Sequence, residues 1–256
     1  MPIDERRLSA RSVILSTLLG TQPPRLPVDR LVRACAIFDI AGGTARTAIS
    51  RMAAAGELVA DDRSRYRLAG AFVDRQRAQD TARAGARLDW NGRWRMAVVV
   101  GEARERAARA DLRRAADRLR LAELRDGVWL RPDNLPRDRE PDAAAIIAAQ
   151  CRWFDVHDPA DDAGVVAVLW DLDAWTATAQ ELRRQMAELQ HRLDRADRHA
   201  LADGFVVSAA ALRHFRTDPL LPDELLPRRW AGRRLRSDYD HFDARFRSVL
   251  AEWFAG

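Results

Sequence analysis

The segment GTARTAISRMAAAGELV at residues 43–59, followed by YRL at residues 66–68, decides the fold of the first third of the chain. The spacing of its apolar residues predicts a helix. Thr44 is suited to cap the start of that helix, and Gly56 follows Ala55 where a helix commonly ends. We therefore expect a helix from Thr44 to Ala55.

The predicted helix has two faces of different chemistry. The inward positions are spaced for packing, and they are Ala45, Ala48, Ile49 and Met52. The outward face carries guanidinium and hydroxyl groups, which can bind base edges and phosphates in a DNA major groove. The candidate DNA-binding residues on it are Thr44, Arg46, Thr47, Ser50 and Arg51. A solvated surface helix also carries arginines, so the helix alone leaves both interpretations open.

The elements around this helix favour DNA binding. Periodicity predicts two helices before it, at 9–19 and 28–38, and two short strands after it, at 57–60 and 66–68. Helix, helix, turn, helix, strand, turn, strand is the order of a winged helix-turn-helix. The turn between the strands would be the wing, with Arg63 and Arg65 at its tip as further DNA-binding candidates.

The charge is concentrated in the same region. The first 90 residues contain 15 arginines against 10 acidic residues, whereas the rest of the chain contains 28 of each. Clustered positive charge favours a polyanionic partner, because phosphate contacts release counterions. The chain has no lysine.

The middle of the chain has a different periodicity. Residues 70–89 predict a helical linker, and the elements that follow are a strand at 94–100, a helix at 105–119, strands at 122–125 and 128–131, a helix at 142–150 and a strand at 152–156. Asp126-Gly127 is a hairpin turn signal. The order βαββαβ is typical of a ferredoxin-like fold.

The last third is predicted to be mainly helical. A heptad seam runs through Trp175, Ala179, Leu182, Met186, Leu189 and Leu193, and it can pair with a second copy or pack within one chain. A final helix is expected over 239–253, with an extended proline-rich segment before it. Seven of the eight tryptophans follow residue 93, and they can form core or line a pocket for a flat ligand.

Searches for catalytic and metal sites find none. The sequence has no GxSxG, P-loop, GxGxxG or HExxH motif, and the strand WRMAVVV lacks the carboxylates of a metal nuclease. The loop at 155–162 holds His157 among four aspartates, which favours helix capping over a metal site. Cys35 and Cys151 are expected to be buried thiols, with redox sensing as the alternative. We expect no enzymatic activity and no cofactor.

Several segments resemble the PaaX family of bacterial transcription regulators. The most specific is TDPLLPDELLPRRWAG at 217–232, and SARSVILSTLLG, WNGRWRMAVV and GVWLRPDNL are also similar to family motifs. Ala231 stands where the family often has proline between tryptophan and glycine. The resemblance extends in register over nearly the whole chain.

The resemblance implies a homodimeric repressor of an aromatic catabolic operon, released from double-stranded operator DNA by an aryl-CoA thioester such as phenylacetyl-CoA. Some relatives have other targets and effectors, or activate transcription, so a regulator of another pathway is the alternative. Arginine suits a CoA phosphate and tryptophan suits an aryl ring, which makes Trp129 and Arg131 the candidate effector residues.

These observations predict an α+β protein. Its expected parts are a winged helix-turn-helix domain at 1–70, a helical linker at 71–90, a ferredoxin-like domain at 91–157, and a helical C-terminal domain at 158–256 for dimerisation or effector binding. No stretch approaches the roughly 20 apolar residues of a membrane span. No secretory signal is evident, so we expect a cytoplasmic protein without membrane contact.

Overall fold

The computed structural model describes residues 8–61, 64–100, 105–157, 161–195, 197 and 199–255. The chain is α+β, as predicted, and it divides into two compact units. Unit 1 comprises residues 1–83, 179–216 and 232–256, and unit 2 comprises residues 84–178 and 217–231. The predicted C-terminal domain is therefore not a separate unit, because its helices and its proline-rich segment pack with different parts of the chain.

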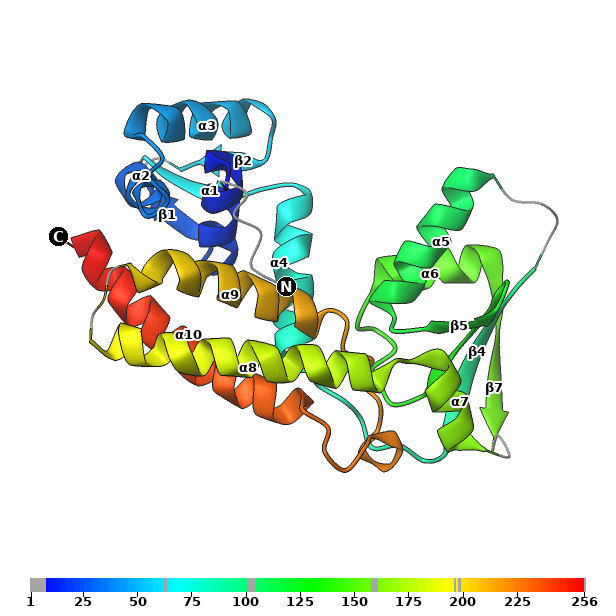
Figure 1. Cartoon of the computed structure of the whole chain (residues 1–256). Helices are drawn as coiled ribbons and strands as arrows, with labels where there is room; N and C mark the ends of the chain where they lie inside the picture. Colours follow the sequence, from blue (N-terminus) through cyan, green and yellow to red (C-terminus); the bar gives the residue numbers. More distant parts are fainter. Residues whose placement is uncertain are drawn as a thin grey trace. The chain divides into compact units, whose positions relative to one another are not determined.

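The first part of unit 1 is a winged helix-turn-helix module (Figure 1). Its elements are α1 (Ala10–Leu19), β1 (Arg25–Pro27), α2 (Val28–Ala36), α3 (Gly42–Ala54), β2 (Leu58–Ala60) and β3 (Arg65–Leu68). The Ser9 side chain caps α1 by accepting a hydrogen bond from the amide of Ser12. The three strands form an antiparallel sheet in the order β1-β3-β2.

Three details of this module differ from the sequence-based prediction. The prolines around β1 suggested only a helix break, but Pro27 is tolerated at the end of an edge strand. The turn before α3 depends on Asp39, whose φ is 55°, rather than on the two glycines that follow. Those glycines lie inside α3, so Thr44 is not its N-cap, and Ala41 occupies that position without a side-chain hydrogen bond.

Four helices complete unit 1. They are α4 (Ala71–Ala84), the part of α8 (Leu172–Asp194) from Ala179 onward, α9 (Ala200–Phe215) and α10 (Gly232–Ala255). Helix α9, which the sequence analysis missed, packs closely on α10: a Cβ atom at Gly204 would lie 2.9 Å from the Phe246 ring. All six residues of the predicted heptad seam are buried in this single chain, which favours packing within the chain over pairing with a copy.

Unit 2 contains the predicted βαββαβ arrangement. Its elements are β4 (Arg93–Val99), α5 (Arg106–Arg118), β5 (Ala122–Arg125), β6 (Val128–Pro132), α6 (Pro141–Gln150) and β7 (Cys151–His157). The strands form an antiparallel sheet in the order β5-β6-β4-β7. The hairpin turn expected at Asp126-Gly127 is present, and Gly127 supplies the positive φ of 76° that it requires.

Both faces of this sheet pack against other parts of unit 2. Helices α5 and α6 cover one face, and Ala97 and Trp129 lie in the core between them. On the other face Trp94 and Leu130 contact Val166 of α7 (Asp162–Leu169), a helix that was not predicted. The proline-rich segment joins this second core through Leu221 and contains the short helix η1 (Asp223–Leu225). Most tryptophans here serve as core.

Candidate DNA interface

Helix α3 is held by its apolar face. Ala45, Ile49 and Met52 recur at helical spacing and are almost fully buried, with exposed fractions of 0, 2 and 2%. This face packs on α1, α2 and β2 of the same module. Burial of one face fixes the orientation of the other.

The opposite face of α3 is open to solvent, as the sequence predicted. Its exposed residues are Thr44, Arg46, Thr47, Ser50 and Arg51. Figure 1 shows α3 on the side of unit 1 away from α9 and α10. The face is therefore sterically accessible within unit 1.

The two arginines of this face are free to bind a ligand. Among the residues that the structure describes, neither Arg46 nor Arg51 has a side-chain hydrogen bond or an ion pair. A guanidinium offers five donors and no acceptor, and it binds guanine or a phosphate in a bidentate manner. Both side chains can therefore bind a polyanion without first breaking an internal contact.

The hydroxyl groups are partly committed to the helix. Thr47 Oγ1 donates to the carbonyl of Gly43 at 2.9 Å, and Ser50 Oγ donates to the carbonyl of Arg46 at 3.1 Å. Each oxygen keeps its acceptor capacity after donating its hydrogen. In this geometry both hydroxyls suit amino groups of bases better than phosphate oxygens.

Of the two residues predicted for the wing tip, Arg65 lies at the base of the wing. Arg65 begins β3 and is half-buried, and its amide donates to Asp61 Oδ1 at 3.0 Å. It is thus the first residue of a strand and not the wing tip, because the turn is shorter than the spacing suggested. Arg63 lies outside the described residues.

Two arginines that sequence analysis missed lie on the sheet of the same module. Arg25 of β1 stands directly opposite Arg67 of β3, and both side chains are exposed. Neighbours at the same register share a sheet face. The alternation of arginine with buried Leu26 and Leu68 was the available signal, but the prolines beside Arg25 hid the strand.

An ion pair neutralises the acidic residue next to the wing. The Arg11 guanidinium binds both carboxylate oxygens of Glu57, with Nε to Oε2 at 2.9 Å. This contact raises the pKa of Arg11, mainly through the hydrogen bond. Glu57 therefore adds little repulsion towards a polyanion.

The two candidate effector residues lie in the core of unit 2. Trp129 and Arg131 are each 5% exposed. The Arg131 guanidinium donates to the carbonyls of Pro132 and Leu119 and to Asn134 Oδ1, at 2.8, 3.1 and 2.6 Å. These contacts give Arg131 a structural role, and an effector role for either residue stays a prediction.

The acidic loop caps a helix, and the two cysteines are buried. Asp161 caps α7 by accepting a hydrogen bond from the Gly164 amide at 2.8 Å, which supports the capping interpretation of the acidic loop. Both cysteines are buried, and burial raises the pKa of Cys35 to about 11. Within the described ranges, no cluster of three potential metal-ligating side chains is found.

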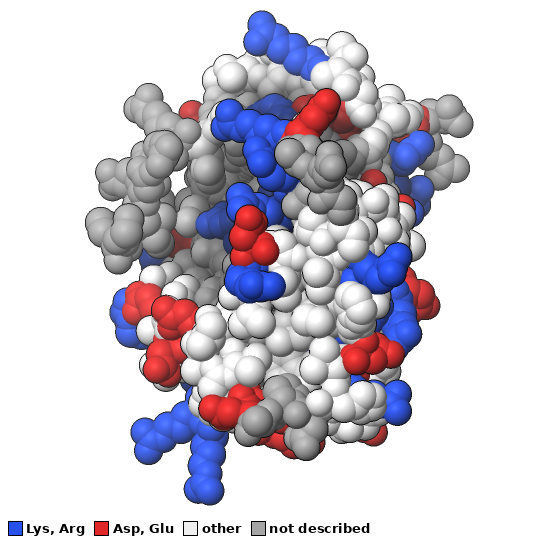
Figure 2. Space-filling view, turned by 90° about the vertical axis from the view of Figure 1, so that its right-hand side faces the viewer, with Lys and Arg blue, Asp and Glu red and all other residues white. Residues whose placement is uncertain are grey.

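Unit 2 carries a group of arginines of its own, around a small cavity lined by Arg95, Arg131, Arg137 and Arg139 together with Asp133. On the face shown in Figure 2, arginine side chains gather in the upper half with acidic side chains among them, and a broad uncharged area lies below. No helix in the described part of the chain has the length and apolar composition to cross a membrane.

Three family models match successive parts of the chain. Residues 9–72 match the family described as PaaX-like protein, residues 87–150 match the PaaX protein central Cas2-like domain, and residues 170–255 match the PaaX-like protein C-terminal domain. A solved structure, "Uncharacterized protein Rv0674 from Mycobacterium tuberculosis", is 38% identical with a TM-score of 0.76, and the alignment covers 96% of this chain and 98% of that one. No curated protein matches significantly.

Proposed function

This chain belongs to the PaaX family of transcription regulators, and we propose that it is a dimeric repressor that binds operator DNA through α3. The observation that carries this proposal is the exposed face of α3 with its two unpaired arginines. A helix of this kind fits the major groove of B-DNA, where arginine binds O6 and N7 of guanine.

The surroundings of α3 would add contacts that do not depend on sequence. Its N-terminal amides have no side-chain cap, so they suit a phosphate oxygen. Arg25 and Arg67 would bind phosphates beside the groove. In a dimer the two α3 helices would enter successive major grooves about 34–36 Å apart.

Regulation would follow from a two-state equilibrium. An effector that binds the DNA-free state more tightly shifts the population towards release, by its difference in affinity for the two states. We propose an aryl-CoA thioester such as phenylacetyl-CoA as that effector. A regulator of another pathway, or an activator, is the alternative.

DNA binding is tested by selecting sites from a random DNA pool with the purified full chain. We expect one enriched motif with two related half-sites. Binding should weaken steeply with salt. The logarithm of the association constant should fall against the logarithm of the salt concentration with a slope of about −0.9 for each phosphate contacted. A protein adaptor that uses its winged helix for other contacts would enrich no motif.

The effector is tested on the complex with that selected DNA. Phenylacetyl-CoA should release the chain, whereas equal concentrations of CoA or acetyl-CoA should not. Release by a different acyl-CoA would favour the other-pathway alternative. Tighter DNA binding on adding an acyl-CoA would contradict release as the regulatory step.

A further inference from the structure

A cavity in unit 1 combines apolar walls with unpaired positive charge. It measures about 270 Å³, close to the lower end of the roughly 300–1,000 Å³ typical of small-molecule pockets. Its walls come from α1, β1 and α2 of the winged-helix module and from α4, α9 and α10. A ligand here would contact the DNA-binding module and the C-terminal helices at once.

One end of the cavity is strongly cationic. Arg213 and Arg216 lie at the end of α9, and Arg75 projects from α4. None of the three has an ion pair with a described residue. The pKa of Arg75 is lowered, first by its partial burial and then by the charges of Arg216 and Arg213. Arg213 and Arg216 therefore each repel Arg75, and an anion placed beside these guanidinium groups would relieve that repulsion.

The acidic residue that lines the cavity does not neutralise this end. Asp243 of α10 is 6% exposed and is already bound by Arg83 at 2.9 Å and by Arg247 at 3.0 Å. Its charge is thus shared by two other arginines. The cavity keeps a positive excess that an external anion can match.

The other end of the cavity is aromatic. Phe205 lies on the same face of α9 as Arg213 and Arg216, and 11 residues separate it from Arg216 in the sequence, about 16 Å along a helix. Phe246 packs edge to face with Phe205 at 6.5 Å, and Arg30 stacks on Phe254 at 5.9 Å. The wall that α9 contributes is therefore polarised, from the Phe205 ring to the guanidinium groups of Arg213 and Arg216.

We propose that this cavity binds an amphipathic organic anion, with its carboxylate or phosphate group on Arg75, Arg213 and Arg216 and its apolar body against Phe205 and Phe246. The ligand would act as the effector, a step that rests on the proposed function. Because the cavity joins α1 and α2 to α9 and α10, filling it would change how the DNA-binding module is held.

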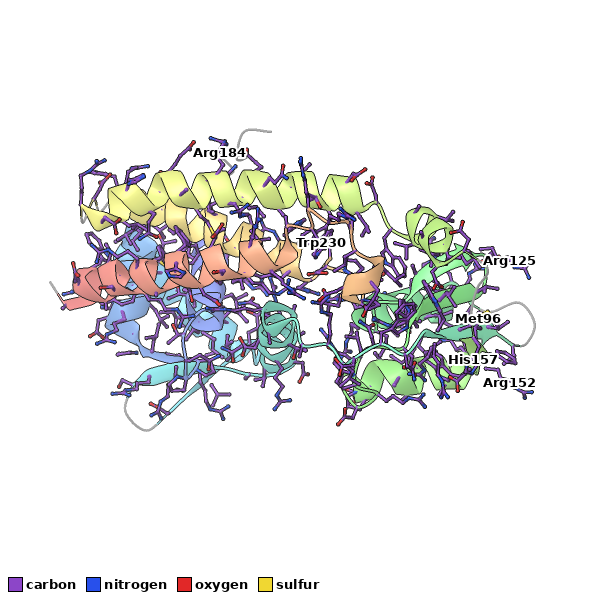
Figure 3. All side chains as sticks on the ribbon, turned by 90° about the horizontal axis from the view of Figure 1, so that it is seen from below. Met96, Arg125, Arg152, His157, Arg184 and Trp230 are labelled. Carbon is purple, nitrogen blue, oxygen red and sulfur yellow. The ribbon has the colours of Figure 1, made fainter. Side chains whose placement is uncertain are left out.

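The test measures ligand binding without DNA, by calorimetry on the full chain. The probes are phenylacetate, phenylacetyl-CoA and CoA, which separate an aryl carboxylate from the phosphates of CoA as the source of the anion. The charge variant is Arg213→Gln with Arg216→Gln. Its matched control is Arg125→Gln with Arg152→Gln, two exposed arginines of unit 2 that project from the ribbon in Figure 3.

We expect at least one probe to bind, and the charge variant to raise its dissociation constant by about tenfold or more, since each lost charged hydrogen bond costs of that order. The control variant should bind as the wild type does. A second variant, Ala209→Phe, places a ring in the cavity and should abolish binding while the circular dichroism spectrum is retained.

Two outcomes would overturn the inference. One is that none of the probes binds the wild type, and the other is that the charge variant and Ala209→Phe bind as tightly as the wild type. Motif selection with DNA is independent of these measurements. If no probe binds the cavity but the chain still selects a DNA motif, the cavity inference is wrong and the DNA-binding proposal is retained.

Discussion

The ring of Phe38, just after α2, meets the ring of Phe205 on α9 edge to face, with ring centroids 5.3 Å apart. Two hydrogen bonds accompany this contact: Arg33 donates to the carbonyl of Phe254 at 2.9 Å, and the Trp253 indole donates to the carbonyl of Arg33 at 3.1 Å. The winged-helix module is therefore held by the C-terminal helices rather than tethered by a linker alone.

This aromatic contact should appear as coupling between two substitutions. In a double-mutant cycle, Phe38→Leu and Phe205→Leu should show an interaction of about 0.5–1.5 kcal/mol in the free energy of unfolding, because each removes the same ring pair. Urea denaturation measures it. Phe38→Leu with Phe215→Leu is the control pair, since these rings do not pair with each other, and it should be additive. Additive effects of Phe38→Leu and Phe205→Leu would show that the contact between the two rings contributes nothing to the free energy of unfolding.

Arg67 should strengthen DNA binding without selecting a sequence. If Arg67 binds a phosphate, the variant Arg67→Ala should bind selected and scrambled DNA more weakly by about the same factor. The slope of the logarithm of affinity against the logarithm of salt concentration should also become smaller by about 1. Fluorescence anisotropy over a salt series measures both quantities. A loss confined to the selected DNA would instead place Arg67 on a base edge.

Asn134 should be important for the stability of unit 2. It is fully buried, accepts from Arg131 and donates to the carbonyl of Leu220 at 3.0 Å. Asn134→Ala should cost about 1–3 kcal/mol, because it leaves a charged donor and a carbonyl unpaired in the core. Asn91→Ala, at an exposed position, is the control for urea denaturation. Equal stability of the two variants would refute this role.

Burial of Cys35 should make stability fall at high pH. Its folded pKa is raised to about 11 from an ordinary value of 9.0, so the unfolded thiol loses its proton first as pH rises. The contribution of this pKa shift to the free energy of unfolding is complete below pH 9. It is lost as the pH rises towards 11, by about 1.4 kcal/mol per pH unit at most. Between pH 8 and pH 10.5 the wild type should therefore lose more unfolding free energy than Cys35→Ala. Equal losses would contradict the raised pKa.

The sequence was sufficient where local pattern and burial agree. In α3, Ala45, Ile49 and Met52 have helical spacing, and all three side chains are buried in the core. The βαββαβ unit was predictable for the same reason, since its strands are apolar and Asp126-Gly127 marks a turn.

The rest depended on contacts that are distant in sequence. Helix α9 was missed because small residues such as Gly204, which permits the close approach of Phe246, weaken its pattern. The cavity could not be predicted either, because Arg75 and Arg216 are far apart in sequence and line one cavity only in the folded chain. The wing residue Arg65 was misplaced because a turn length is poorly fixed by composition.

The most direct test of the DNA-binding proposal is the affinity of Arg46→Ala for the DNA motif selected by the wild type, at one fixed salt concentration. Because Arg46 is exposed and unpaired, folding should be unchanged, and loss of a base contact should weaken binding by roughly 1–3 kcal/mol and relax specificity at one base position. Arg152→Ala, exposed on unit 2, should bind as the wild type does. Unchanged affinity and base preference in Arg46→Ala would contradict the assignment of α3 as the DNA-reading helix.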